Sequence, residues 1–378
     1  MSGDPEQSYF ADGLAEDLIT DLSKLPGLSV IARQSSFAYK GSPINMKLVG
    51  EELGANYLVE GSVRKANNRV RVNAQLISTS DGSHIWAERF DRSLSDVFDL
   101  QDEINANIVR ALDLTLRREH PRAVVGRSTL NIEAYDYFLR AMDESRPPNK
   151  ETWEGAHYCY MRAVELDPEY AVAYAYLSLH TVRAWIHRWK HDRAPLILQA
   201  LDWANHAVNL DEGLAIAHSS LAWAAFWNGQ HGIALEEAET ANLLNPSDAD
   251  ALERFAFISC WTEHPDLAIR IVERLKHLNP SEGYDFHEGL AHFIKADYAK
   301  AIRSLKCHVE HYPKFTPALA YLASSYGLHG DIEQAASTVE KLKQLNPNYQ
   351  LDVQEREIFK NPEDRDRFFE GLRIGGLS

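Results

Sequence analysis

His187 and His191 are four residues apart, the spacing at which two histidines on one helix face can hold a metal ion. They belong to a segment, 185–192, in which aromatic and basic residues alternate, a pattern that also suits stacking on nucleic-acid bases. No third metal ligand is evident. One octapeptide in a chain of net charge −16 also offers few positive charges for binding nucleic acid. We therefore predict no metal, no cofactor and no nucleic-acid partner, and interpret the segment as an extension between two helices that packs its tryptophans.

The other reactive side chains form no arrangement typical of an enzyme. Catalysis needs a nucleophile or base within reach of an orienting partner, and the chain contains no nucleophile elbow, phosphate loop or Cys-x-x-Cys pair. Glu60 and Arg64 fall on the same face of an expected strand and could form a structural ion pair. Cys159, Cys260 and Cys307 lie in apolar helical contexts and are expected as free, structural thiols. The sequence predicts no catalytic residues.

A repeat of nearly fixed length organises the second half of the chain. Pro246, Pro280, Pro313 and Pro347 recur at a spacing of about 34 residues, which is the tetratricopeptide period. Two earlier copies end at Pro168 and Glu212, a wider spacing, because the second copy carries the extension described above. We expect about six helix pairs over residues 131–350, with small residues where paired helices approach closely, among them Ala268, Gly289 and Ala301.

A stack of such pairs offers a concave surface, to which the first helix of each repeat contributes its positions 2, 5, 9 and 12. Aromatic residues dominate these positions, and large aromatics are preferred anchors for a peptide in a groove. Our candidate binding residues are Ser219, Trp223, Phe226, Glu253, Phe257, Phe286 and Phe293. The alternative is that the rings pack against neighbouring helices inside a tight superhelix. Alanine substitution of Trp223 and Phe257 separates these interpretations.

Residues 1–120 have mixed patterns. An amphipathic helix is expected over 12–25, ended by Pro26-Gly27, then a short strand over 28–32 and a helix over 47–53 closed by Gly54. Alternation in 57–64, 70–76 and 85–90, with turn signals at Asn67-Asn68 and Asp81-Gly82, predicts an antiparallel meander, followed by a helix over 94–116. The fold class is therefore α+β and mainly α: a small α/β domain, a linker at 121–130, the helical repeats, and a capping segment at 351–378.

Four motifs of the first domain carry a family resemblance: Ser8-Tyr9-Phe10-Ala11-Asp12-Gly13-Leu14-Ala15-Glu16-Asp17, Val49 to Ala55, Tyr57 to Val63, and Trp86 to Asp91. Together they resemble the TolB-like α/β domain that precedes tetratricopeptide repeats in bacterial signalling proteins. In that family the domain follows a class III adenylate cyclase domain or a winged-helix DNA-binding domain. Such a cyclase holds two metal ions with paired aspartates, and neither Asp81 nor Asp91 provides that pair here, so this chain should not make cyclic AMP.

The resemblance implies a non-catalytic module that binds a protein or peptide partner and regulates a neighbouring effector. Two alternatives stay open, namely the C-terminal regulatory part of an adenylate cyclase and the sensory part of a winged-helix activator. Family members also enter this domain from an apolar strand that is absent before Met1, so either the chain starts at an internal methionine or it is a shorter natural homologue. In the first case the sheet keeps an unpaired edge that invites homo-oligomers. Because neither a signal peptide nor a membrane segment is evident, the expected location is cytoplasmic.

Overall fold

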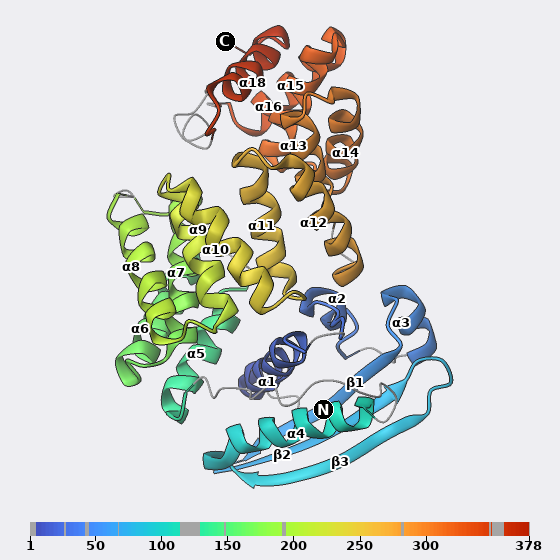
Figure 1. Cartoon of the computed structure of the whole chain (residues 1–378), viewed down its shortest axis with the longest axis vertical. Helices are drawn as coiled ribbons and strands as arrows, with labels where there is room; N and C mark the ends of the chain where they lie inside the picture. The colour runs from blue at the N-terminus through green and yellow to red at the C-terminus, as the bar shows by residue number, and fades with distance from the viewer. Residues whose placement is uncertain are drawn as a thin grey trace. The chain divides into compact units, whose positions relative to one another are not determined.

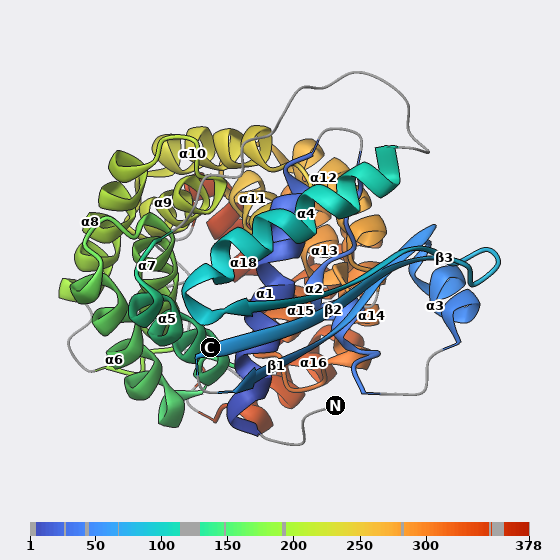
Figure 2. The same ribbon diagram turned by 90° about the horizontal axis from the view of Figure 1, so that it is seen from below.

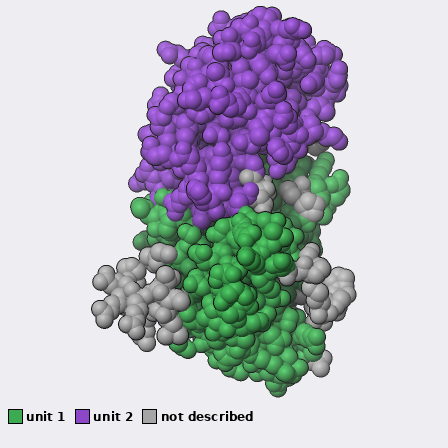
Figure 3. Space-filling model, turned by 90° about the vertical axis from the view of Figure 1, so that its right-hand side faces the viewer, with its two compact units in different colours: residues 1–224, 240–248 green, residues 225–239, 249–378 purple. Residues whose placement is uncertain are grey.

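The computed structural model describes residues 5–25, 28–41, 45–66, 68–113, 129–146, 149–190, 194–280, 283–347, 349 and 359–377 (Figure 1). The chain divides into two compact units, coloured in Figure 3. Unit 1 comprises Met1–Ala224 and Thr240–Asp248, and unit 2 comprises Ala225–Glu239 and Ala249–Ser378. Most described residues are helical and the strands form one small sheet, so the predicted α+β, mainly α class is confirmed.

Unit 1 begins with the α/β elements, which are α1 (Pro5–Ser23), α2 (Arg33–Phe37), α3 (Met46–Leu53), β1 (Tyr57–Ala66), β2 (Arg69–Ser78), β3 (His84–Ser93), a 3₁₀ turn (Leu94–Asp96) and α4 (Val97–Asp113). The three strands form an antiparallel meander in the order β1-β2-β3, with a register shift between Leu76 and Ile77. Gly54 closes α3 in the left-handed conformation, at φ 62°. The meander and the α3 stop agree with the sequence pattern.

The alternation in β2 explains which face of the sheet is covered. Val70, Val72, Ala74 and Leu76 are buried, whereas the intervening side chains are exposed or half-exposed. Helix α4 packs against β2 and β3, and α1 packs against β1 (Figures 1 and 2). Because side chains alternate across a strand, the apolar half of β2 enters the core under these helices and the polar half forms an open face.

Two expectations for this region are wrong. Residues 28–32 form no strand, since the sheet within the described part of the chain contains only β1, β2 and β3. An apolar run becomes a strand only where a neighbouring strand pairs with its backbone. Glu60 does not pair with Arg64 but accepts a hydrogen bond from Gln75 at 2.8 Å on the neighbouring strand. Residues four apart along a strand are about 13 Å apart, too far for direct contact of these groups.

The remaining helices of unit 1 form the first repeats: α5 (Ile132–Glu144), α6 (Lys150–Leu166), α7 (Ala171–Ile186), α8 (Ala194–Leu210) and the first residues of α9 (Ala215–Trp227). Helices α5 and α6 pack as a pair, as do α7 and α8. Phe138 of α5 belongs to the same hydrophobic core as Phe10 and Leu14 of α1. The α/β elements and the first repeats therefore share one core.

Unit 2 contains the later repeats, with α10 (His231–Leu244) shared between the units, α11 (Ala249–Trp261), α12 (Pro265–Leu278), α13 (Asp285–Ile294), α14 (Tyr298–His311), α15 (Thr316–His329), α16 (Ile332–Leu345) and a final helix, α18 (Pro362–Ile374). Helices α11 and α12, α13 and α14, and α15 and α16 pack as pairs. Ala268, Ala301 and Ala335 are fully buried at the expected small-residue positions. The helix pairing confirms tetratricopeptide-like repeats.

Substitution of Gly289 tests how closely the paired helices must approach each other. A Cβ added there would lie 2.6 Å from Cγ of Leu305 and 3.2 Å from its backbone nitrogen. We expect Gly289→Ala to destabilise the chain by about 1–3 kcal/mol through overpacking, measured by urea denaturation. Gly232 is the matched control, because it is also helical and a Cβ there meets nothing within 4 Å. If Gly232→Ala lowers stability as much as Gly289→Ala does, close packing is not the cause.

Candidate functional site

An aromatic cluster in unit 2 contains part of the predicted binding surface. The rings of Phe226 and Phe257 are 5.5 Å apart in an edge arrangement, and Trp227 stacks on Phe257 at 6.0 Å. Trp261 and His287 lie 5.9 and 6.2 Å from Phe257. Phe257 therefore stands at the centre of rings from α9, α11 and α13. We call Trp227, Phe257, Trp261 and His287 the Phe257 cluster.

The structure separates the predicted binding residues by their exposure. Ser219, Phe226, Phe286 and Phe293 are buried, at 2 %, 2 %, 7 % and 0 % exposure. Trp223, Glu253 and Phe257 are half-buried. Ser219 and Trp223 belong to unit 1 and the other five to unit 2. Phe226, Phe286 and Phe293 thus pack inside the fold, as the alternative interpretation expects, whereas Phe257 keeps part of its surface accessible and its role in binding stays a prediction.

Phe286 and Phe293 are engaged in packing. The Phe286 ring lies 5.1 Å from Phe315, and Phe293 lies 5.3 Å from Tyr321 and 6.1 Å from Phe368. These edge-on arrangements are typical of core aromatic pairs. Phe293 is fully buried, and Phe368 is one of the rings packed against it.

Trp227 and Trp261 were missed by the sequence analysis, although a signal for them exists. Both occupy position 13 of their repeats and are one tetratricopeptide period apart. Trp227 is half-buried and Trp261 is 4 % exposed. A search restricted to positions 2, 5, 9 and 12 excludes them, whereas an aromatic recurring at the repeat period predicts a shared environment.

The carboxylate of Glu253 lies beside the Phe257 cluster. Its Oε1 lies 3.7 Å from Nε2 of His287, and its side chain is 45 % exposed. Burial, followed by the nearby His308, lowers the pKa of His287 to about 4. His287 is therefore neutral at pH 7, and this contact is not a full ion pair. The cluster combines half-buried aromatic rings with a negative carboxylate, features that suit an apolar segment bearing a cation.

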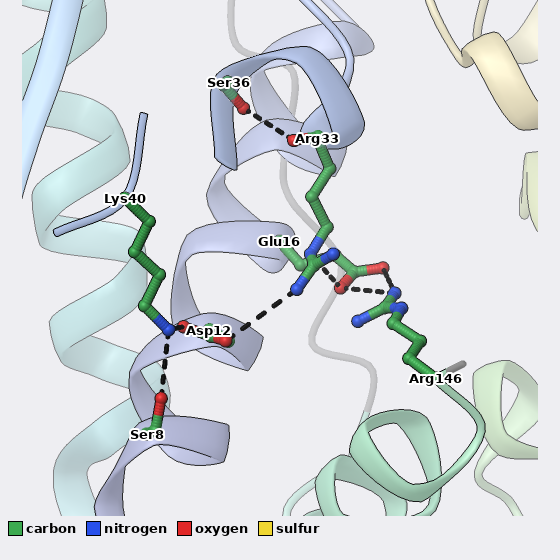
Figure 4. A network of polar contacts seen from close by, with 7 residues as sticks. All are labelled: Ser8, Asp12, Glu16, Arg33, Ser36, Lys40 and Arg146. Carbon is green, nitrogen blue, oxygen red and sulfur yellow. Dashed lines mark hydrogen bonds and ion pairs between the residues drawn. The ribbon is translucent and has the colours of Figure 1, made fainter. Parts of the chain in front are cut away.

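A second polar arrangement joins α1 to the repeats inside unit 1 (Figure 4). The carboxylate of Glu16 accepts hydrogen bonds from Nη2 of Arg146, which follows α5, at 2.9 Å to each oxygen. Nε of Arg33 lies 3.2 Å from the same carboxylate, and its guanidinium also reaches Asp12 at 3.8 Å. Lys40 contacts Asp12 from the other side. Two arginines distant in sequence thus share Glu16 and tie α1, α2 and α5 together.

Next to this network, Asp17 is half-buried between α4 and α5. Its Oδ2 accepts hydrogen bonds from the Tyr135 hydroxyl and from Nε2 of Gln101, the latter at 2.8 Å. Burial raises the pKa of Asp17 from its ordinary 3.8 to about 7, although the Tyr135 bond opposes this shift. A carboxyl with this pKa titrates near neutral pH, so the junction between α1 and α5 carries a proton-sensitive group.

The described residues show no arrangement suited to covalent or metal chemistry. They contain no group of three or more His, Cys, Asp or Glu side chains that could hold a metal ion. Burial raises the pKa of Cys159 to about 11, which keeps this thiol protonated. Asp91 already pairs with Arg71 and Arg69, which lower its pKa to about 2. Asp81 accepts hydrogen bonds from Ser83 in its own turn.

The aromatic and basic segment after α7 packs as its sequence suggested. Helix α7 ends at Ile186, so His187 is its C-cap rather than part of a helix face, and His191 lies outside the described residues. Trp185 is buried, and Trp189 stacks on His187 at 5.1 Å. Lys190 lies 4.8 Å over the ring of Trp153 and pairs with Glu154. These side chains of the segment are thus engaged in intramolecular contacts.

A shallow hollow of about 410 Å³ lies on the open face of the sheet. Its lining includes Glu60, Ser62, Asn73, Gln75 and Arg89. Asn73 donates to Ser62 at 2.9 Å, and Gln75 donates to Glu60. These polar groups hydrogen-bond largely to one another, so we interpret the hollow as part of the solvated face of the sheet.

Substitution of Asp17 tests whether its carboxyl is protonated in the folded chain. Its raised pKa stabilises the fold at low pH, and this contribution is lost as pH rises from about 4 to about 7, at up to about 1.4 kcal/mol per pH unit. Asparagine keeps the acceptor for Tyr135 and Gln101 without the charge. The gain in melting temperature of Asp17→Asn over the parent should therefore grow between pH 5 and pH 8. Glu51→Gln, on the exposed face of α3, is the control and should show no such trend. A pH-independent difference for Asp17→Asn would rule out a neutral buried carboxyl.

A bacterial protein is similar to this chain in sequence. The chain is 44 % identical over 241 residues to a Rhizobium meliloti (strain 1021) protein named "Putative adenylate cyclase 3". The match covers 64 % of this chain and 40 % of that protein, so the chain spans less than half the length of this relative. No protein-family model matches the chain.

Several solved structures are similar to the chain at low sequence identity. YrrB, titled "a TPR protein with an unusual peptide-binding site", is 18 % identical with a TM-score of 0.36, covering 50 % of this chain and 93 % of YrrB. Pseudomonas aeruginosa pilF is 17 % identical with a TM-score of 0.43, covering 60 % and 95 %. A monomeric mutant of IFIT1 with Gppp-AAAA is 15 % identical with a TM-score of 0.48, covering 74 % and 65 %. At these scores the repeat assignment rests on the helix pairs of the chain itself.

Proposed function

We propose that the chain is a non-catalytic interaction module that binds a protein segment at the Phe257 cluster. The observation that carries this proposal is the half-buried ring of Phe257, held among Trp227, Trp261 and His287 and bordered by the carboxylate of Glu253. A rigid aromatic ring on a helix loses little entropy on binding and is a frequent anchor in interfaces. Stacked helix pairs of this kind commonly present binding surfaces to other proteins.

The partner that fits this surface is an apolar or amphipathic segment with a cationic side chain. The aromatic faces favour apolar groups and cations, and Glu253 adds a negative charge beside them. The net charge of −16 also favours a partner that is not itself strongly acidic. Among the described residues no helix is long and apolar enough to cross a membrane, and our proposal involves no lipid.

The finer proposal is that this module regulates an adenylate cyclase. The 44 % identity to a protein bearing that name supports it. The shared core of α1 and α5, together with the Glu16 carboxylate held by Arg33 and Arg146, supports a role for the α/β elements in passing a change in the first repeats onward. Coupling between sites needs such continuous packed contacts.

The binding proposal is tested with a phage-displayed library of random peptides, selected on the full chain. Synthetic copies of the selected peptides should bind the parent and lose at least about tenfold in affinity to Phe257→Ala, with unfolding free energy lowered by no more than about 2 kcal/mol. Tyr158→Ala is the matched control, because Tyr158 is an exposed aromatic on α6, in the other unit. The proposal fails if no peptide is enriched, or if the peptides bind Phe257→Ala as tightly as the parent.

The edge of the sheet supports a second kind of partner, another copy of this chain. Strand β1 pairs with β2 alone among the described strands, and Val59 on it is 44 % exposed. Exposed apolar edge strands favour association, and a charge there opposes it. We expect the parent to form dimers by analytical ultracentrifugation and Val59→Lys to shift them to monomers. Leu48→Lys on α3, where Leu48 is 51 % exposed and lies on no strand edge, should leave the dimers unchanged. A monomeric parent at all concentrations contradicts this proposal.

A further inference from the structure

The final helix of unit 2 does not continue the stack of repeats. Between successive repeats of unit 2, a first helix packs mainly on the second helix of the repeat before it, as α13 does on α12 and α15 on α14. Its packing on the preceding first helix is weaker, as for α13 on α11. Helix α18 reverses this order, since it packs mainly on α15 and much less on α16. A helix that only capped the stack would follow the order of the repeats.

Helix α18 lies on the positions of α15 that belong to the binding surface. Positions 9 and 12 of this repeat are Ser324 and Gly327. Oγ of Ser324 donates a hydrogen bond to the carbonyl of Phe368 at 2.9 Å. A Cβ added to Gly327 would lie 2.3 Å from the carbonyl oxygen of Gly371, and one added to Gly371 would lie 2.3 Å from that of Ser324. The two glycines therefore allow the backbones of α15 and α18 to touch.

Aromatic contacts extend this docking across three first helices. The ring of Phe368 lies 4.5 Å from Tyr321 of α15 and 6.1 Å from Phe293 of α13. Phe359, just before α18, lies 4.8 Å from Trp261 of α11. The segment from Phe359 to Phe368 thus covers Phe293, one of the residues predicted to bind a partner, and reaches the Phe257 cluster at Trp261.

Polar contacts fix the direction of this segment. Lys360 pairs with Glu263, beyond the end of α11, at 3.0 Å. Arg367 donates to the carbonyl of Ile294 at 3.0 Å and to the hydroxyl of Tyr298 at 3.1 Å. Side-chain hydrogen bonds to exposed backbone carbonyls at a helix end are common in peptide recognition as well as in folds.

The face of α18 that docks has the pattern of an amphipathic helical ligand. Asp364, Phe368 and Leu372, each four residues apart, are buried, together with Phe369 and Gly371. Glu363, Asp366, Glu370 and Arg373 are exposed. Anchors at i, i+4 and i+8 are typical of helices that bind in a groove.

We propose that residues 359–374 are an intramolecular occupant of the partner-binding surface, and that the partner is an amphipathic helix that competes with α18. This inference rests on the proposed function, because it names the class of segment that the same surface takes. A competing helix presents adjacent aromatic residues, with a small residue and a leucine three and four positions after the first aromatic. Docked α18 lowers the affinity for such a helix, and its release makes Phe293 and Trp261 available.

The test uses the full chain and a fluorescein-labelled peptide of its residues 359–374 as the probe. In Phe368→Ala the tethered helix loses its central ring, while Tyr321, Phe293 and Trp261 remain. By fluorescence anisotropy this variant should bind the peptide at least about tenfold more tightly than the parent. Glu370→Ala, on the exposed face of α18, should behave as the parent. The peptide carrying the same Phe368→Ala change should bind none of the three proteins.

Amide hydrogen exchange on the same variants distinguishes an occupant from a structural cap. We expect α13 and α15 to keep most of their protection in Phe368→Ala, because an occupant can leave a folded surface. If Phe368→Ala binds the peptide no more tightly than the parent does, the inference is wrong, whether or not α13 and α15 stay protected. This outcome is separate from the fate of the proposed function. If library peptides bind in a way that depends on Phe257, the binding proposal stands even if α18 is only a cap. If the peptide of residues 359–374 binds but the library yields no such peptides, the α18 inference stands and the binding proposal at Phe257 fails.

Discussion

The close approach of helices at residues without a bulky side chain is the constraint on which the repeats depend. Ala268, Ala301 and Ala335 are fully buried, and Gly289 packs directly on Leu305. A single helix pair cannot bury both of its faces, so close packing within each pair is what allows successive pairs to share a core. The same device recurs where Gly371 of α18 meets α15. One packing rule thus holds both the stack and the helix that docks on it.

The repeats could be predicted because their signal is periodic, whereas features that depend on non-local partners could not. Prolines and small residues recur at the tetratricopeptide period, and each repeat folds with its neighbours in sequence. Residues 28–32 have the composition of a strand, but no described strand pairs with them. Phe293 and Phe257 occupy equivalent kinds of position, yet one is covered by Phe368 and the other is half-exposed. Nothing in the local sequence around Phe293 indicates that a segment much later in the chain will cover it.

Charge at the start of unit 1 is arranged so that neighbouring carboxyls have different roles. Glu16 and Asp17 are adjacent in α1, but Glu16 meets two guanidiniums while Asp17 meets a phenol and an amide. A paired carboxylate keeps its charge at little cost, whereas an unpaired buried one favours the proton. Helix α1 therefore contacts α5 through an ionic contact of Glu16 and through the Asp17 carboxyl, whose raised pKa makes the second contact sensitive to pH near neutrality. This contrast makes the junction between the α/β elements and the repeats sensitive to its environment.

A tethered helix changes what the measured affinity of a partner means. Leu345 ends α16 and Phe359 begins the docked segment, so α18 is linked to its surface by a short stretch of chain. Short tethers give effective concentrations on the order of millimolar. To displace the helix, a free partner must therefore bind the surface more tightly than α18 does, or be present at a comparably high concentration. A partner with only modest intrinsic affinity is therefore excluded, while one that matches the aromatic pattern of α18 and also binds at Phe257 and Glu253 can displace it. Selectivity then arises from the difference between two occupants of one surface rather than from the strength of either alone.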